Sequence, residues 1–459
     1  MALPALRWPP ISLSFFETSV SRMSLALFMT RRNQLVSVLV LLTVLGSISL
    51  ASAQATKEET LSGPSSHEIF EGPHRHLLGD WGGERTQLEE KGVDFDLQYI
   101  SDFLWNIKGV QKDRLASFDR VRGTVDIDFG SLLHKDGLYF HATGLWQGGA
   151  ILGNYLGLLT SPSGMSSGNT FRLDSWWLEK RLKNQRIAIR IGQFAGQDFY
   201  GAQHYATSFI FEPIGYALGN LSTTFETFDP PSTPAMELRI VPIRHFYVKS
   251  MVLAADRFQY AHNPTGFVPQ FRGAPMSVSE IGFSPGKKAS SVRAFDNVES
   301  RKGYSGLYQF GASYNPGKFT NPASTTPRAG NYLLYWMASQ ALWRADRQAA
   351  KGLDATFSYD WSPADVNRNN SMLTAGLRFN EPLPVPFHNT MSLGYVRNML
   401  SPNFAVNHVP WRAEQGVEFN ALLHLVPMMF VQPVVQYYDN VGGGRQRAVV
   451  FGFRTKVEF

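Results

Sequence analysis

The C-terminal segment 449–459 alternates between apolar and charged side chains and ends the chain on an aromatic residue. One set of alternate positions carries Val449, Phe451, Phe453, Val457 and Phe459, and the other carries Arg454, Lys456 and Glu458. Successive side chains of a β-strand point to opposite faces, so this segment has one apolar face and one charged face. Such a strand, about ten residues long, is the repeating unit of a transmembrane β-barrel. Half-buried strands of soluble proteins alternate too. The number of such segments in the chain therefore decides between a soluble β-protein and a membrane barrel.

The same alternation recurs along most of the chain. Near the first repeat, for example, Phe95 and Leu97 stand against Asp94 and Asp96. We count about 16 candidate strands, an even number, as bacterial barrels require. They lie near 93–108, 120–129, 138–147, 171–182, 186–191, 236–242, 246–254, 278–284, 304–314, 332–343, 353–361, 373–379, 390–397, 417–425, 428–438 and 449–459. The sequence therefore predicts an all-β fold, an antiparallel transmembrane barrel.

The connections between these strands are unequal on the two sides. Those at 183–185, 243–245 and 426–427 are short and would face the periplasm, and long ones would lie outside. The long connections are 148–170, 195–235, 255–277 and 398–413. Short turns on one side and long loops on the other are the barrel pattern, for which a soluble β-sandwich gives no reason. The connection at 285–303 is longer than the pattern requires, so a strand boundary there is open to error.

The N-terminus has the features of an export signal. Arg31-Arg32 precede an apolar run that ends at Leu50, and Ala51-Ser52-Ala53 follows as a cleavage site, so residues 1–53 are predicted to be a signal peptide. The alternative is a membrane anchor, but the run of about 16 residues is short of the roughly 20 that a spanning helix needs. A start at Met23 or Met29 would make the preceding residues, at most 1–28, an extension of the true start.

Residues 54–92 are predicted to be a periplasmic tail followed by a short helix. The tail is rich in Ser, Glu, Gly and His. Asp80 is placed to cap a helix over 82–90, which Gly92 would end. This helix would partly plug the periplasmic mouth or simply seal the base of the barrel. Residues 93–459 then form the barrel.

Composition and motifs exclude several other functions. The chain has no Cys, and its 43 Lys and Arg residues are scattered without a clustered basic run, so no nucleic-acid partner is expected. His74 and His76 have no carboxylate nearby, so no metal site and no cofactor are predicted. The sequence contains no H-E-x-x-H and no phosphate loop. His141 and His424 fall on distant strands and offer no catalytic dyad, so an enzyme is not expected.

A barrel of about 16 strands encloses water, and its inward positions carry charges of both signs. Guanidinium and carboxylate groups offer rigid donors and acceptors to hydroxyl-rich solutes, although such charges also serve simply to solvate a lumen. The inward set is Arg120, Arg122, Asp126, Asp128, Arg190, Arg239, Lys249, Arg378, Arg454 and Glu458.

The long connection 195–235 is the best candidate for an element that narrows the channel. Outside loops of wide barrels can fold inward, and this one is rich in aromatic residues. It holds Phe199-Tyr200, His204-Tyr205, Phe209 and Phe211, with Asp198 and Glu212. Aromatic faces beside polar groups suit sugar rings, which have apolar faces and hydroxyl edges. Plain loop packing would use the same residues.

Four stretches of the sequence resemble the OprB-type carbohydrate-selective porins. They are the Gly-Asp-Trp-Gly-Gly-Glu-Arg-Thr-Gln-Leu-Glu-Glu-Lys-Gly segment at 79–92, the Phe-Arg-Leu-Asp-Ser-Trp-Trp-Leu-Glu block at 171–179, Ile-Arg-Ile-Gly-Gln-Phe at 189–194, and the last two strands from Val431. The resemblance covers 77–459. It implies a 16-stranded channel in the outer membrane of a Gram-negative bacterium that passes mono- or disaccharides by diffusion.

The resemblance also implies a sugar-contacting constriction of arginines and acidic residues. By position, Arg172, Glu179 and Arg190 are the nearest matches, and Glu179 then needs a bulge in its strand to face inward with Arg172. At 207–211 the chain reads Thr-Ser-Phe-Ile-Phe in place of the family's usual stretch with Asn-Ser-Ser, which leaves the preferred sugar open.

The expected partners follow from this reading. They are outer-membrane lipid, small sugars and the barrel-assembly machinery, which would recognise the strand ending at Phe459; a homo-oligomer is left open. Two other functions are alternatives: a general or ion-selective porin and, more remotely, a membrane-embedded barrel hydrolase.

Overall fold

A computed structural model of the chain describes residues 76–459 apart from 166–167, 183–184, 197–198, 202–207, 216–231, 257, 286–305, 321–325, 347–350 and 403–412. The chain divides into two compact units, Met1–Thr56 and Lys57–Phe459, and every described residue belongs to the second. The predicted signal peptide, its start-site extension and the tail up to residue 75 lie outside the described residues.

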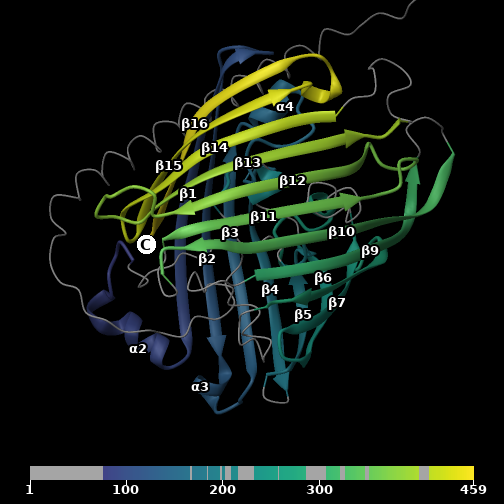
Figure 1. Cartoon of the computed structure of the whole chain (residues 1–459). Helices are drawn as coiled ribbons and strands as arrows, with labels where there is room; N and C mark the ends of the chain where they lie inside the picture. Colours follow the sequence, from purple (N-terminus) through teal and green to yellow (C-terminus); the bar gives the residue numbers. More distant parts are fainter. Residues whose placement is uncertain are drawn as a thin grey trace, which may run out of the picture. The chain divides into compact units, whose positions relative to one another are not determined.

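Sixteen strands of the described residues close into one barrel (Figure 1). They are β1 (Val93–Gly109), β2 (Arg114–Asp128), β3 (Leu138–Gly149), β4 (Thr170–Leu182), β5 (Ile187–Phe194), β6 (Thr233–Ile243), β7 (Phe246–Ala255), β8 (Ala274–Phe283), β9 (Gly306–Thr320), β10 (Pro327–Arg344), β11 (Gly352–Trp361), β12 (Asn369–Asn380), β13 (Asn389–Leu400), β14 (Ala413–Val426), β15 (Met429–Asp439) and β16 (Arg447–Glu458). Each strand is antiparallel to the next. The predicted fold class and strand count are confirmed.

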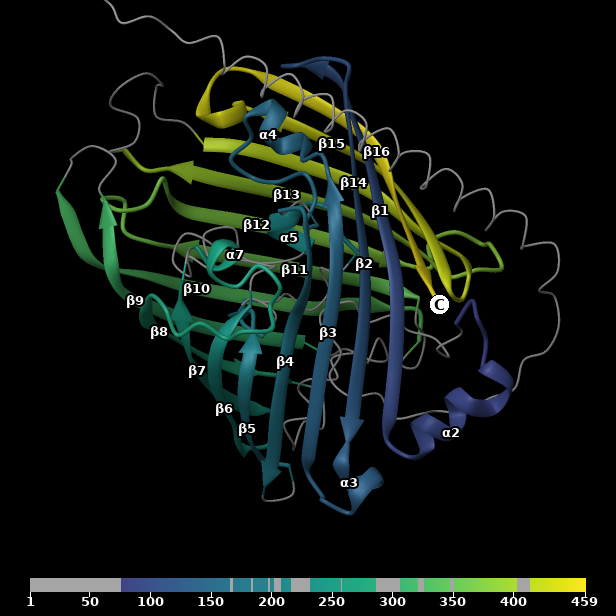
Figure 2. The same cartoon turned by 180° about the vertical axis from the view of Figure 1, so that it is seen from behind.

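The barrel closes between the first strand and the last. β16 pairs antiparallel with β1, so that Phe103 lies opposite Phe453 and Tyr99 opposite Val457. In Figures 1 and 2 the yellow β16 accordingly runs beside the purple β1. The final strand therefore has a partner on both edges, which leaves no open edge in the sheet.

The two faces of the wall are those that the alternation predicts. On β16, Phe451 is 46% exposed and Val450 is fully buried; on β14, Phe419 is 50% exposed and Glu418 is fully buried. Because exposed apolar residues alternate with buried polar ones around the ring, the apolar face points outward and the polar face lines the interior.

Short helical segments occupy the connections and the N-terminal lead-in. They are η2 (Trp81–Gly83), α2 (Glu84–Glu90), α3 (Phe129–Leu133), α4 (Leu152–Leu156), α5 (Glu212–Gly215), α7 (Gln259–His262) and η5 (Val441–Gly443). The long connections join β3 to β4, β5 to β6, β7 to β8 and β13 to β14, as predicted. The connection between β8 and β9 is also long, and most of it, 286–305, lies outside the described residues; the strands on both sides lie where the sequence places them.

The predicted N-terminal helix is present, with a modified start. A 3₁₀ turn precedes it, in which Gly82 and Gly83 have φ angles of 73° and 100°, so α2 begins only at Glu84. Asp80 still supports the helix, because its Oδ1 accepts the backbone N–H of Thr86 at 2.9 Å. Arg85 donates to the carbonyl oxygens of Phe95 and Phe459 at 3.2 and 3.0 Å. The helix thus bridges the start of β1 and the end of the chain, which favours sealing of the barrel base.

Candidate functional site

A bulge in β4 brings Arg172 and Glu179 to the same face. Thr143 of β3 pairs with Ser175 and Gly144 pairs with Leu173, so Asp174 is an extra residue in β4. An extra residue shifts the alternation by one position, which is why side chains seven positions apart both point inward. The bulge that the sequence required is confirmed.

Glu179 lies at the centre of a buried charge network, which we call the arginine–glutamate cluster and define as Glu179, Arg181, Arg190, Glu237 and Arg239. The Glu179 carboxylate is 2.5 Å from Arg181 Nε and 2.8 Å from Arg190 Nη2, and it also accepts from Arg239. Glu237 is 3.1 Å from Arg190 Nη1 and 3.4 Å from Arg239 Nε. The register explains these pairs, because Arg190 of β5 lies directly opposite Glu179 of β4 and Glu237 of β6.

Aromatic rings cover this cluster from the lumen side. The Arg190 guanidinium carbon lies 4.2 Å from the centre of the Trp177 ring and 4.0 Å from that of Phe199, which comes from the β5–β6 connection. The side chains of Glu179 and Arg190 have no exposed surface. This geometry satisfies the charges within the protein and presents no open face of either residue to a solute. The sugar contact that the family resemblance implies for them stays a prediction.

The other predicted site residues lie apart from the cluster, also on the inner face. Arg172 is buried, with its guanidinium carbon 5.7 Å from the Tyr260 ring. Arg120 is buried and donates from Nε to Gln147 at 3.0 Å, and Arg122 is buried two positions further along β2. Of the seven predicted residues, only Asp126 keeps a partly exposed side chain, at 17%.

Asp126 belongs to a hydrogen-bonded chain that the sequence did not reveal. The Asp126 carboxylate lies 2.8 Å from His141 Nδ1, and His141 Nε2 lies 2.9 Å from the Thr143 hydroxyl. The imidazole also stacks on Trp177, with ring centres 4.9 Å apart. Acid, imidazole and hydroxyl in this order resemble a hydrolytic triad in outline. His141 and Thr143 are buried, however, so the arrangement offers no reachable nucleophile.

A second charge pair, in which the carboxylate is buried and the ammonium partly exposed, lies further round the wall. Lys249 Nζ is 2.8 Å from Glu280, whose carboxylate also accepts the hydroxyls of Tyr247 and Tyr335 at 2.6 and 2.7 Å. The Lys249 ammonium lies 4.6 Å from the ring of Tyr200, another residue of the β5–β6 connection. The sequence placed Lys249 on the inner face but did not identify Glu280.

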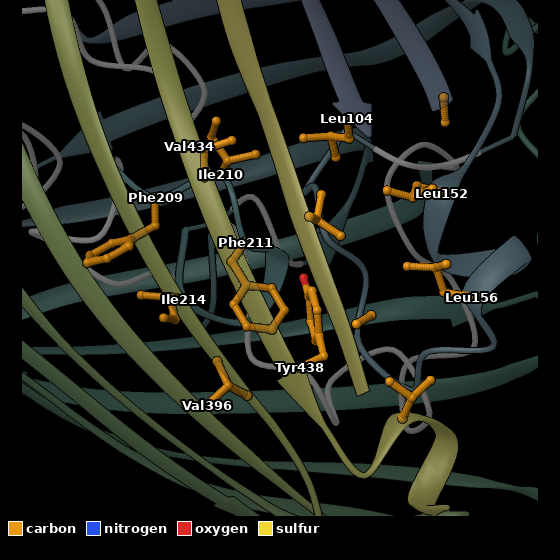
Figure 3. Packing of buried hydrophobic residues seen from close by; sticks show 14 of the residues in the cluster. Leu104, Leu152, Leu156, Phe209, Ile210, Phe211, Ile214, Val396, Val434 and Tyr438 are labelled. Atoms are coloured by element: carbon orange, nitrogen blue, oxygen red, sulfur yellow. The ribbon is translucent and has the colours of Figure 1, made fainter. Parts of the chain in front are cut away.

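Part of the β5–β6 connection folds into the barrel, as predicted. We call residues 208–214 the folded-in segment. The backbone N–H groups of Ile210 and Phe211 donate to the inward-facing Glu418 at 2.9 and 2.7 Å, and α5 contacts β12 and β13. Figure 2 shows α5 enclosed by the barrel wall, and Figure 3 shows its packing. Phe209, Ile210 and Phe211 are buried, so loop packing accounts for both phenylalanines. Asp198, His204 and Tyr205 lie outside the described residues.

A second connection, between β3 and β4, reaches the same wall. Glu414 of β14 accepts the N–H groups of Leu159 and Thr160 at 2.9 and 3.0 Å and the Thr160 hydroxyl at 2.8 Å. The two connections also bond to each other, because Gly164 N–H donates to the carbonyl of Ile210 at 3.0 Å. Both loops are thus fixed inside the barrel by carboxylates of one strand.

We expect Glu212 of α5, which lies outside the membrane-spanning strands, to make this packing sensitive to pH. Burial raises the pKa of its carboxyl from 4.5 to about 7, although the N–H of Ser161 lowers it. A raised carboxyl pKa stabilises the folded segment at low pH, and this stabilisation is lost as the pH rises from 4.5 to about 7. We therefore expect hydrogen exchange at 159–164 and 208–214 to accelerate across this window, relative to a Glu212→Gln variant at each pH. Equal acceleration in both proteins would contradict the assignment to Glu212.

Two further searches cover the part of the chain that the structure describes. None of its helices has both the length and the apolar character needed to span a bilayer. Among the same residues, no group of three or more His, Asp or Glu side chains is arranged to hold a metal ion.

Comparison with known proteins adds independent findings. The family model "Carbohydrate-selective porin, OprB family" matches residues 112–459. The chain is 30% identical to Porin B of Pseudomonas aeruginosa over 149 residues, which cover 30% of this chain and only 33% of that protein's length. It is 20% identical to the putative porin QuiX of Acinetobacter baylyi over 86% of this chain and 95% of that protein. The high-pH structure of Pseudomonas putida OprB aligns with a TM-score of 0.74 at 18% identity, covering 87% of this chain and 100% of that one, which shows the shared barrel fold.

Proposed function

The chain belongs to the OprB family of carbohydrate-selective porins, and we infer that it is an outer-membrane channel through which mono- and disaccharides diffuse passively. The family match over 112–459 is the observation that carries this function. Proteins of this kind reside in the outer membrane of Gram-negative bacteria, where the apolar outer face of the barrel meets lipid. A transport channel, not an enzyme, is the function that this family and fold support.

The described interior supports passage of a hydroxyl-rich solute. A 16-stranded barrel is wide enough to hold an aqueous path, and inner-face charges of both signs provide donors and acceptors. Asp126, Lys249 and Arg454 are partly exposed, at 17%, 13% and 12% of their side chains. We propose that such groups meet the sugar directly, while the arginine–glutamate cluster holds the shape and the charge of the wall behind them.

We also propose two partners beyond lipid and sugar. The strand ending at Phe459 has the alternating pattern that the barrel-assembly machinery would recognise during insertion. A homo-oligomer would use the apolar outer face. The hydrolase alternative is disfavoured because the acid–imidazole–hydroxyl chain at His141 is buried.

A planar-bilayer experiment tests the proposed function. We expect single channels in KCl to be blocked reversibly and saturably by glucose or maltose, because a sugar held by several weak contacts occupies the path of the ions. Polyethylene glycol of similar hydrodynamic size is the matched control, since it lowers bulk conductivity without the hydroxyl pattern. Equal reductions by sugar and by polymer would favour the alternative, a general porin.

A further inference from the structure

The inner face of β14 is built to receive a loop. Its inward-facing residues are Glu414, Gly416, Glu418 and Asn420, in alternation with outward-facing residues such as Phe419. The two carboxylates point at backbone N–H groups of the loops, and the glycine between them leaves room. Glu418 is held in turn by Gln436 at 2.7 Å and Asn420 at 2.6 Å, so side chains of the wall as well as the loop fix its position.

Gly416 is one of three inward-facing glycines on neighbouring strands, with Gly376 on β12 and Gly394 on β13. Gly376 and Gly394 lie directly opposite each other in the sheet. A Cβ atom on Gly394 would lie 2.5 Å from Ile214 Cδ1 and 2.7 Å from Phe209 Cε1. On Gly376 it would lie 2.8 Å from Thr356 Cγ2 of the neighbouring strand and 2.9 Å from Phe209 Cζ, and on Gly416 it would lie 2.5 Å from Phe211 Cε1. Carbon atoms in normal contact are about 3.5–4.0 Å apart, so rings of the folded-in segment fill the space that side chains would need.

The folded-in segment is held against these glycines by apolar packing. Phe209, Phe211 and Ile214 are buried in one cluster with Val396 and Tyr438 (Figure 3). The Phe211 ring meets the Tyr438 ring edge to face, with centres 5.4 Å apart. The segment therefore lies at a depth that three features set together: the glycines, the aromatic contacts and the Glu418 hydrogen bonds.

We propose that Gly376, Gly394, Gly416 and Glu418 form a loop seat that fixes how far the folded-in segment projects into the lumen, and so sets the size limit for solutes. This inference rests on the proposed function, because a size limit matters only in a channel. The physical reason is that the barrel wall is rigid and the rings lie directly on it. Any added volume at the glycines must move the rings toward the barrel axis, since overpacked side chains displace their neighbours.

The decisive variant is Gly416→Ala, with Gly144→Ala as its control. Gly144 lies on the outer face of β3, where an added Cβ would meet nothing closer than 4.0 Å. We expect Gly416→Ala to lower KCl conductance and, in liposome swelling, to reduce disaccharide entry relative to monosaccharide entry by about twofold or more, because passage falls steeply as a pore narrows. Gly144→Ala should match the wild type. Unchanged or increased conductance of a folded Gly416→Ala barrel, judged by heat-modifiable mobility, would overturn the proposal.

Two further variants test the mechanism separately. Adding Phe211→Leu to Gly416→Ala removes the ring edge that the new methyl group displaces, so conductance should return toward the wild-type value; no recovery would overturn the proposal. Glu418→Gln should act in the opposite direction, because its amide nitrogen cannot accept the second backbone N–H and the segment loosens. We expect it to raise the size limit. If Gly416→Ala fails to assemble, this variant decides, and an unchanged size limit would then overturn the loop seat.

The readout separates the loop seat from the proposed function. KCl conductance reports the cross-section of the pore without any sugar present. A channel that shows no sugar-specific block would contradict carbohydrate selectivity and still give the loop seat its full test.

Discussion

Replacing Glu179 by alanine should cost the barrel about 3–5 kcal/mol of unfolding free energy, the loss expected when one partner of a buried charge pair is removed. Glu179 is fully buried and its carboxylate accepts from Arg181, Arg190 and Arg239. Without it, Arg190 and Arg239 share the single carboxylate of Glu237, and Arg181 loses the carboxylate that it contacts. Their desolvation is then uncompensated, because Trp177 and Phe199 exclude water from Arg190.

The measurement is equilibrium unfolding of the refolded barrel in urea, followed by tryptophan fluorescence. Asp365→Ala is the matched control, since it removes the carboxylate of the Arg328–Asp365 pair, whose side chains are 44% and 39% exposed. An exposed pair contributes only about 0–1 kcal/mol, so this variant should unfold close to the wild type. Similar losses in the two variants would mean that burial does not determine the strength of the cluster.

The arginine–glutamate cluster shows which features of this site can be predicted from the sequence and which cannot. Alternation placed Arg190 and Arg239 on the inner face, and the bulge that Glu179 needed is present. Alternation did not reveal that Glu179 and Glu237 lie on either side of Arg190, because which residues face each other depends on the register between strands. Register is set by turns and bulges, which the polar–apolar pattern of one strand does not contain. Glu179 and Arg190, which the resemblance assigns to a sugar site, are therefore found paired with each other.

The fold itself was largely predictable, for a physical reason. In a barrel whose consecutive strands pair, neighbours in sequence are neighbours in the sheet, so alternation along the chain is enough to give the wall and its two faces. The loop seat was not predictable in this way. Gly416 and Phe211 are remote in sequence, and a glycine in a strand suggests only a weak position until the ring that fills its space is seen.

Placing arginine on the outer face at Phe419 should destabilise the barrel by about 2–4 kcal/mol, because a guanidinium near the middle of the bilayer loses its hydration. Phe419 is central in β14 and lies in one outward row with Val435 and Phe451, to which the sheet pairs it in turn. All three are between 42% and 50% exposed, as expected for residues in contact with lipid.

The matched control is Leu422→Arg on the same strand, which lies on the inward parity and is only partly buried. There the guanidinium reaches the polar interior, so the loss should be much smaller than at Phe419. Unfolding in urea from lipid vesicles measures both variants against the wild type. The two sites lie three residues apart on the same strand and point to opposite faces of the wall. Equal losses of unfolding free energy in the two variants would mean that the face exposing Phe419 is not the face that meets lipid. The apolar side chains on that face of β14 would then pack against something other than lipid.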